Sequence, residues 1–133
     1  MATILVGWEL GDGLGHVQRL RPIARALAER GHRPVYALAN VVDPWTVLRA
    51  DGLPIVQAPT WARGLPAGRT FQAASLADVL AIRGWASVES LYPLTQAWSQ
   101  LIDFVRPDLV VCDYAPTLCL AAYRQVPVVQ VGN

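Results

Sequence analysis

Apolar residues are arranged along this chain in two alternating patterns: short unbroken runs, and longer stretches in which they recur every three or four positions. Runs rich in Val, Ile and Leu are typical of strands buried on both faces, and the spaced pattern is typical of helices that bury one side. The runs predict strands at residues 4–6, 34–39, 55–57, 109–112 and 126–131.

The intervening stretches predict a helix after each of the first four strands. The first of these helices has a buried stripe of Val17, Leu20, Ala24, Leu27 and Ala28. Pro22 has no amide hydrogen, so we expect the regular helix to begin close to Arg19 or to kink at that point. Asp43 followed by Pro44 predicts an N-cap and first helical residue for the second helix.

Strands that alternate with helices, with no hairpin turn between them, indicate parallel pairing with right-handed crossovers. The sequence therefore predicts an α/β fold with a doubly wound, Rossmann-like parallel sheet of about five strands. The length of 133 residues fits one domain, residues 1–133.

Three polar features are expected at the carboxyl edge of this sheet, where ligands bind in such folds. The first is the glycine-rich loop that follows the first strand, with Gly11, Asp12, Gly13 and Gly15 as candidate substrate-binding residues. A bare loop that leads into a helix N-terminus suits an anionic or polar ligand.

The second feature is the long loop at residues 58–70, where Trp61 and Arg63, together with Arg69, could contact a substrate. The alternative is that these side chains only decorate a loop. Connections of this length have a function more often than short ones do, but the sequence does not decide between the two roles for these side chains.

The third feature is Asp113, which follows the fourth strand and could meet His16 from the first loop. A carboxylate on one imidazole nitrogen fixes the tautomer and leaves the other nitrogen free to act as a base. The alternative is that both residues cap helices. His32 follows a helix C-terminus, where a cation suits the helix dipole, and we expect no catalytic role for it.

Other chemistries find less support. A dinucleotide-binding G-x-G-x-x-G that begins at Gly11 would need a glycine where His16 stands, and Asn40 takes the place of the ribose-binding acid. No G-x-S-x-G motif suggests a hydrolase. No carboxylate cluster suggests a metal, and Cys112 and Cys119 lack metal-ligand spacing, so we expect buried, reduced thiols.

The composition and net charge limit the kinds of binding partner and the location that we expect for this chain. Hydrophobic residues make up 53% of the chain, charged residues 16%, and the net charge is +1, which gives no reason to expect nucleic acid. No apolar run approaches the roughly 18 residues that a transmembrane segment needs. The N-terminus has no basic segment typical of a signal peptide, so a cytoplasmic location is expected.

Two segments resemble the GT-B glycosyltransferases, more narrowly the UDP-dependent, macrolide- and flavonoid-type transferases of bacteria. One is Gly15-His16-Val17 with residues 22–32, and the other is residues 106–113 with the following segment to 129. The resemblance implies an N-terminal acceptor-binding domain, with His16 as general base for the acceptor hydroxyl and Asp113 as the residue that orients it. The loop at 11–14 is richer in glycine than in most members, which leaves the class of acceptor open.

The resemblance also implies a partner domain that binds the nucleotide-diphosphate sugar, and we expect this chain to be a fragment without that domain and inactive alone. The function expected of the parent enzyme is transfer of a sugar, with inversion, from that co-substrate to a hydroxyl of an apolar small molecule or lipid. No cofactor is expected. The alternatives are a non-catalytic ligand-binding module on the same fold and, with less support, an NAD-dependent oxidoreductase.

Overall fold

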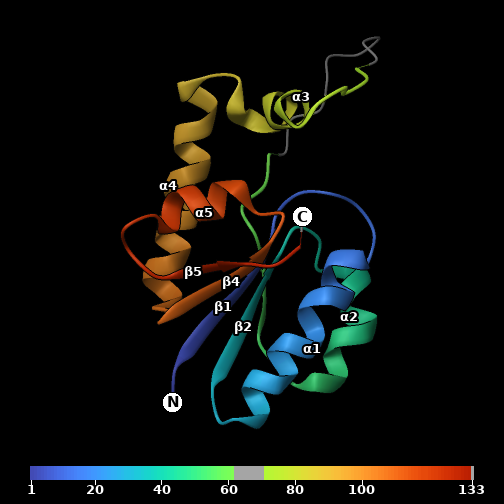
Figure 1. Cartoon of the computed structure of the whole chain (residues 1–133), viewed down its shortest axis with the longest axis vertical. Helices are drawn as coiled ribbons and strands as arrows, with labels where there is room; N and C mark the ends of the chain where they lie inside the picture. The colour runs from blue at the N-terminus through green and yellow to red at the C-terminus, as the bar shows by residue number, and fades with distance from the viewer. Residues whose placement is uncertain (62–70, 133) are drawn as a thin grey trace.

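A computed structural model of the chain describes residues 1–61 and 71–132. Its strands form one parallel sheet in the order β3-β2-β1-β4-β5, which confirms the predicted fold class (Figure 1). The strands are β1 (Thr3–Trp8), β2 (Arg33–Leu38), β3 (Ile55–Gln57), β4 (Leu109–Asp113) and β5 (Val128–Gln130). The chain order runs outward from β1 to β3 and then returns to the other side of β1, so the sheet has a switch point between β1 and β4.

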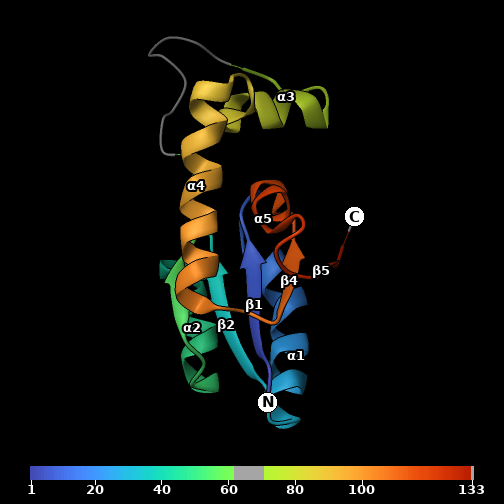
Figure 2. The ribbon, with the colours of Figure 1, turned by 90° about the vertical axis from the view of Figure 1, so that its left-hand side faces the viewer.

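Helices cover both faces of the sheet. They are α1 (Gly15–Glu29), α2 (Val42–Leu48), α3 (Leu76–Leu80), α4 (Val88–Val105) and α5 (Pro116–Ala122), with a 3-10 turn η1 (Arg49–Asp51) and a π-type turn η2 (Ala81–Trp85). α1 and α2 lie on one face, and α4 and α5 on the other (Figures 1 and 2). α3 and one end of α4 extend past the carboxyl edge of the strands (Figure 2).

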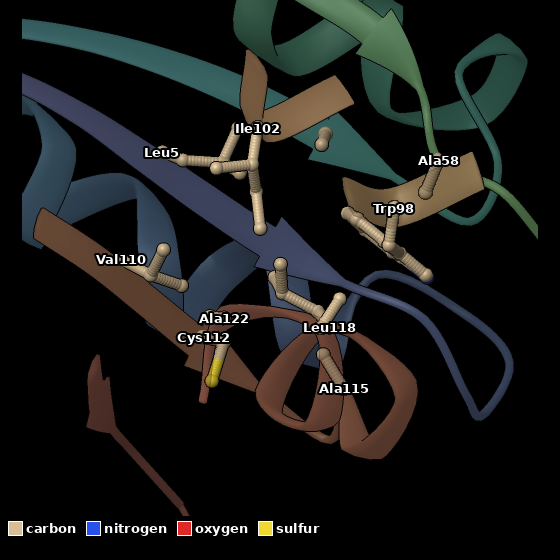
Figure 3. Close-up of a cluster of buried hydrophobic side chains, with 11 residues drawn as sticks. Leu5, Ala58, Trp98, Ile102, Val110, Cys112, Ala115, Leu118 and Ala122 are labelled. Carbon is tan, nitrogen blue, oxygen red and sulfur yellow. The ribbon is translucent and has the colours of Figure 1, made fainter. Parts of the chain in front are cut away.

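Successive side chains of the central strands enter two separate cores, one on each face of the sheet. Leu5 and Val110 pack with Trp98 of α4 and Leu118 of α5, as Figure 3 shows. On the opposite face, the neighbours of Leu5 along β1 pack against the buried stripe of α1. Burial on both faces explains why these strands are unbroken apolar runs rather than alternating ones.

Two helix starts differ from the sequence-based prediction. α1 begins at Gly15, and Pro22 lies inside it. α2 begins at Val42, so Asp43 is inside the helix, and Asn40 provides the side-chain acceptor for the amide of Val42 at 2.8 Å. In the described parts of the chain, no helix combines the length and apolar character needed to cross a membrane.

Candidate active site

His16 and Asp113 meet at the switch point of the sheet. Asp113 ends β4 and is paired in register with Trp8 at the end of β1, and His16 is the second residue of α1. The Nδ1 atom of His16 lies 3.0 Å from Oδ2 of Asp113. The Asp113 side chain is 1% exposed and that of His16 is 22% exposed. The structure thus brings together the two predicted catalytic residues, while their catalytic role stays a prediction.

This contact determines what the imidazole can do. A carboxylate accepts hydrogen bonds and cannot donate them, so Nδ1 carries the proton and Nε2 is left as an acceptor in the neutral ring. If Nε2 takes up a proton, the imidazolium remains beside a buried carboxylate, which stabilises its charge. The pair can therefore accept a proton from a ligand at Nε2.

Two aromatic rings hold the imidazole in place. Trp8 stacks on His16 with ring centroids 5.5 Å apart and planes 22° apart, and Tyr114 lies at 5.8 Å with its plane tilted by 38°. Tyr114 has a φ of 49°, in the left-handed region, and its carbonyl accepts the amide of Leu10 at 3.0 Å. A non-glycine residue in this conformation is a form of backbone strain that is often found at functional sites.

The glycine loop lies against the free nitrogen of His16. Gly11 has a φ of 90°, and a Cβ atom added to it would lie 2.6 Å from Nε2. Gly13 also has a positive φ, of 78°, but a Cβ atom there would have nothing within 4 Å. The absence of a side chain at Gly11 therefore keeps the space beside Nε2 open, whereas Gly13 serves the path of the loop.

Arg19 is a third member of the site that the sequence analysis did not predict. Its Nη1 lies 3.2 Å from Oδ1 and 3.0 Å from Oδ2 of Asp113. Gly132, with a φ of 89°, lies so close that a Cβ there would collide with both side chains of this pair. The signal was present in the sequence, because Arg19 is three residues after His16 and so lies on the same side of α1.

Glu9 is a second residue that the sequence analysis missed. It directly follows β1, is only 6% exposed, and accepts the amide of Thr117 at 2.8 Å through Oε2. Burial raises the pKa of Glu9, and the hydrogen bonds from Thr117 oppose this rise. Its position directly after an apolar strand was the available signal.

Among the described residues, two hollows lie beside the His16–Asp113 pair. One, of about 150 Å³, is lined by Trp8, Glu9, Leu10, Gly11, Asp12, Gly13, Ala39, Asn40, Thr60, Trp61 and Arg83. The other, of about 440 Å³, is lined by Leu76, Leu80, Tyr114, Ala115, Pro116, Cys119 and Gln130. His16 lines neither hollow, but it lies against residues that do: Trp8 and Gly11 of the first and Tyr114 of the second.

Most of the predicted substrate-binding residues line the first hollow, namely Gly11, Asp12, Gly13 and Trp61. Gly15 is instead the first residue of α1 and lines neither hollow. Arg63 and Arg69 lie outside the described residues. Among the described residues, no group of three or more His, Cys, Asp or Glu side chains is arranged to hold a metal ion.

The sequence matches no family model and no curated protein. The structure is similar to MurG of Acinetobacter baumannii, with a TM-score of 0.65 and 17% identity over 98% of this chain and 35% of MurG. It is also similar to the glycosyltransferase SsfS6 of Streptomyces sp. SF2575, with a TM-score of 0.64 and 22% identity over 98% of this chain and 39% of that enzyme. This chain has the fold of one Rossmann-like domain of the GT-B glycosyltransferases. It spans little more than a third of the length of these two proteins.

The same fold also occurs in a protein of another kind. The C-terminal domain of PF1911 hydrogenase from Pyrococcus furiosus matches with a TM-score of 0.56 and 16% identity, over 98% of this chain and 91% of that domain. A second structure of SsfS6 contains thymidine diphosphate. One fold therefore serves different activities, and the similarity alone does not assign an activity to this chain.

Proposed function

We propose that this chain is the acceptor-binding domain of an inverting glycosyltransferase that uses a nucleotide-diphosphate sugar. The observation that carries the proposal is the contact between His16 and the buried Asp113 at the switch point of the sheet, with Nε2 of His16 facing the side-chain-free Gly11. Ligands of doubly wound folds bind at this point, so a proton acceptor stands where a substrate would be held.

In this mechanism, Nε2 of His16 removes the proton of an acceptor hydroxyl as its oxygen attacks the anomeric carbon of the sugar. The diphosphate leaves from the opposite face of that carbon, so one C–O bond forms, one breaks and the configuration inverts. Asp113 keeps Nδ1 protonated and stabilises the imidazolium that forms. The nucleotide-diphosphate sugar would be bound mainly by a second domain, and the thymidine diphosphate held by SsfS6 supports this class of donor.

The hollows support an acceptor with a hydroxyl on an apolar body. Most residues of the larger hollow are apolar, including Leu76, Leu80 and Pro116, and its lining residue Tyr114 lies against the His16 ring. The smaller hollow, on the Gly11 side, is lined by residues that include Glu9 and Asp12. An acceptor placed with its apolar body in the larger hollow would bring a hydroxyl towards His16 and the polar residues beyond it.

The rival proposal is a non-catalytic ligand-binding module, because the fold alone does not determine an activity. The test is to incubate the complete polypeptide that carries this domain with a panel of nucleotide sugars and hydroxylated apolar acceptors. Mass spectrometry would detect a glycoside, and NMR of the product would give its anomeric configuration. The proposal predicts an inverted glycoside from at least one donor. Acceptor binding without consumption of any nucleotide sugar would favour the binding module.

A further inference from the structure

A pair of thiols lies beside the candidate site but takes no part in the proposed transfer. Cys112 is in β4, directly before Asp113, and Cys119 is in α5. Both are free cysteines, and their Sγ atoms are 3.4 Å apart. A disulfide requires about 2.05 Å between the sulfurs, so a small side-chain movement separates the dithiol from the bonded form.

We propose that these residues form a thiol modification site, in which Cys119 is attacked first by a small disulfide and Cys112 then closes an intramolecular disulfide. This proposal is independent of sugar transfer. The two cysteines differ in the way that such a sequence of reactions requires, because one is accessible and the other is enclosed.

Cys119 is the accessible partner. It is half-buried and lines the 440 Å³ hollow, together with Leu76, Leu80 and Tyr114. Cys112, in contrast, is fully buried in the core between the sheet and the α4–α5 layer, where Figure 3 shows it with Leu118 and Ala122. A small disulfide that enters the hollow can therefore reach Cys119 and not Cys112.

The surroundings also favour ionisation of Cys119 before Cys112. The hydrogen bond from Cys112 stabilises a thiolate at Cys119 and lowers its pKa. The same bond raises the pKa of Cys112, and burial and the nearby carboxylates of Asp113 and Glu9 raise it further. Because the thiolate is the nucleophile in disulfide exchange, this difference supports attack by Cys119.

The exchange balances without any further reactant. The Cys119 thiolate attacks a small disulfide, forms a mixed disulfide and releases one small thiolate. Cys112 then loses its proton, and its sulfur attacks Sγ of Cys119 and releases the second small thiolate. The protein loses two electrons and two protons, and the small disulfide is reduced to two thiols. The new bond would tie the end of β4 to α5 beside Asp113 and change the wall of the larger hollow.

The test uses the chain, oxidised glutathione as the probe and intact-mass spectrometry after alkylation of the remaining thiols. The wild type should lose both alkylatable thiols without forming a disulfide between chains. Cys112→Ser should accumulate one glutathione adduct at Cys119, because the second step is blocked. Cys119→Ser should not react while folded, because Cys112 remains enclosed.

A second measurement does not depend on how the variants fold. In the native wild type, brief treatment with iodoacetamide should label Cys119 ahead of Cys112, as peptide mapping would show. The proposal is overturned if Cys112 is labelled first. It is also overturned if the folded wild type keeps both thiols in oxidised glutathione, or if oxidation gives only disulfides between chains.

Discussion

The close approach of Gly11 to His16 predicts that alanine at position 11 will disturb the imidazole, whereas alanine at position 13 will not. Both glycines have positive φ, at 90° and 78°. An L-residue in this region costs about 1–2 kcal/mol, so both variants should lose that much unfolding free energy. Only at position 11 would the new Cβ meet Nε2 of His16, at 2.6 Å.

At 2.6 Å the methyl group and the ring cannot coexist, so one of them must shift, and we expect the His16 ring, as the end of a side chain, to rotate away from Gly11. An off-rotamer side chain costs about 0.5–1.5 kcal/mol, and loss of the hydrogen bond to Asp113 costs about 1–3 kcal/mol more. Gly11→Ala should therefore be clearly less stable than Gly13→Ala in urea unfolding.

The ¹⁵N and ¹H NMR signals of the His16 ring give the second readout. They should shift in Gly11→Ala and stay as in the wild type in Gly13→Ala. Equal losses of stability together with unchanged His16 signals in both variants would refute the described approach of Gly11 to the ring.

Three further predictions concern the surroundings of the pair. Arg19→Gln removes the cation that contacts both carboxylate oxygens of Asp113. The free energy of unfolding, measured in urea, should fall by about 1–2 kcal/mol. This loss is smaller than for a fully buried cation, because half of the Arg19 side chain is exposed to water. Burial raises the pKa of Glu9 above its ordinary value of 4.5, so the folded state holds this proton more tightly and wild-type stability should fall as pH rises through the window above 4.5. Glu9→Gln should remove that loss, and unfolding curves of equal pH dependence would contradict it. A methyl group on Gly7 would overlap Leu118, so Gly7→Ala should cost about 1–3 kcal/mol, and Leu118→Ala in the same chain should cost less than it does alone; additive losses would contradict that packing.

The strands were predictable because each is a short apolar run, and β1, β2 and β4 are buried on both faces, whereas the edge strands β3 and β5 are partly or fully exposed. The glycine loop after β1 and Asp113 at the end of β4 marked the sheet edge where ligands bind. The boundaries of the helices were less so. Pro22 is tolerated inside α1, although its ring removes one backbone hydrogen bond, because Leu20 and Ala24 on either side of it are buried and tertiary packing outweighs local preference. Asn40, and not Asp43, accepts the amide of Val42, and the sequence did not distinguish the two because both side chains favour helix starts.

The sequence predicted the two central residues of the candidate site, His16 and Asp113, but not the residues that contact or surround them. The prediction of a parallel sheet put His16, after the first strand, and Asp113, after the fourth, at the same edge, which was enough to propose that they could meet. Arg19 was missed because its three-residue spacing from His16 shows only that the two side chains share one side of the helix. The spacing does not show that Asp113 lies against that side. Glu9 was missed because a single acid after a strand usually remains in water, and its burial depends on the amide of Thr117, more than a hundred positions away in the sequence.

The most direct test of the central claim compares His16→Ala with His32→Ala in the complete polypeptide that carries this domain, with a hydroxyl acceptor and a nucleotide sugar that the wild type uses. A positioned general base contributes about 10²–10⁴ to the rate, so His16→Ala should lower kcat by that factor and leave donor binding nearly unchanged. His32 directly precedes β2, and its Nδ1 accepts the amide of Ala2, so it has no contact with the His16–Asp113 pair to lose. His32→Ala should therefore keep the wild-type kcat. A wild-type kcat in His16→Ala would contradict the account and reduce His16 to a structural residue at the start of α1.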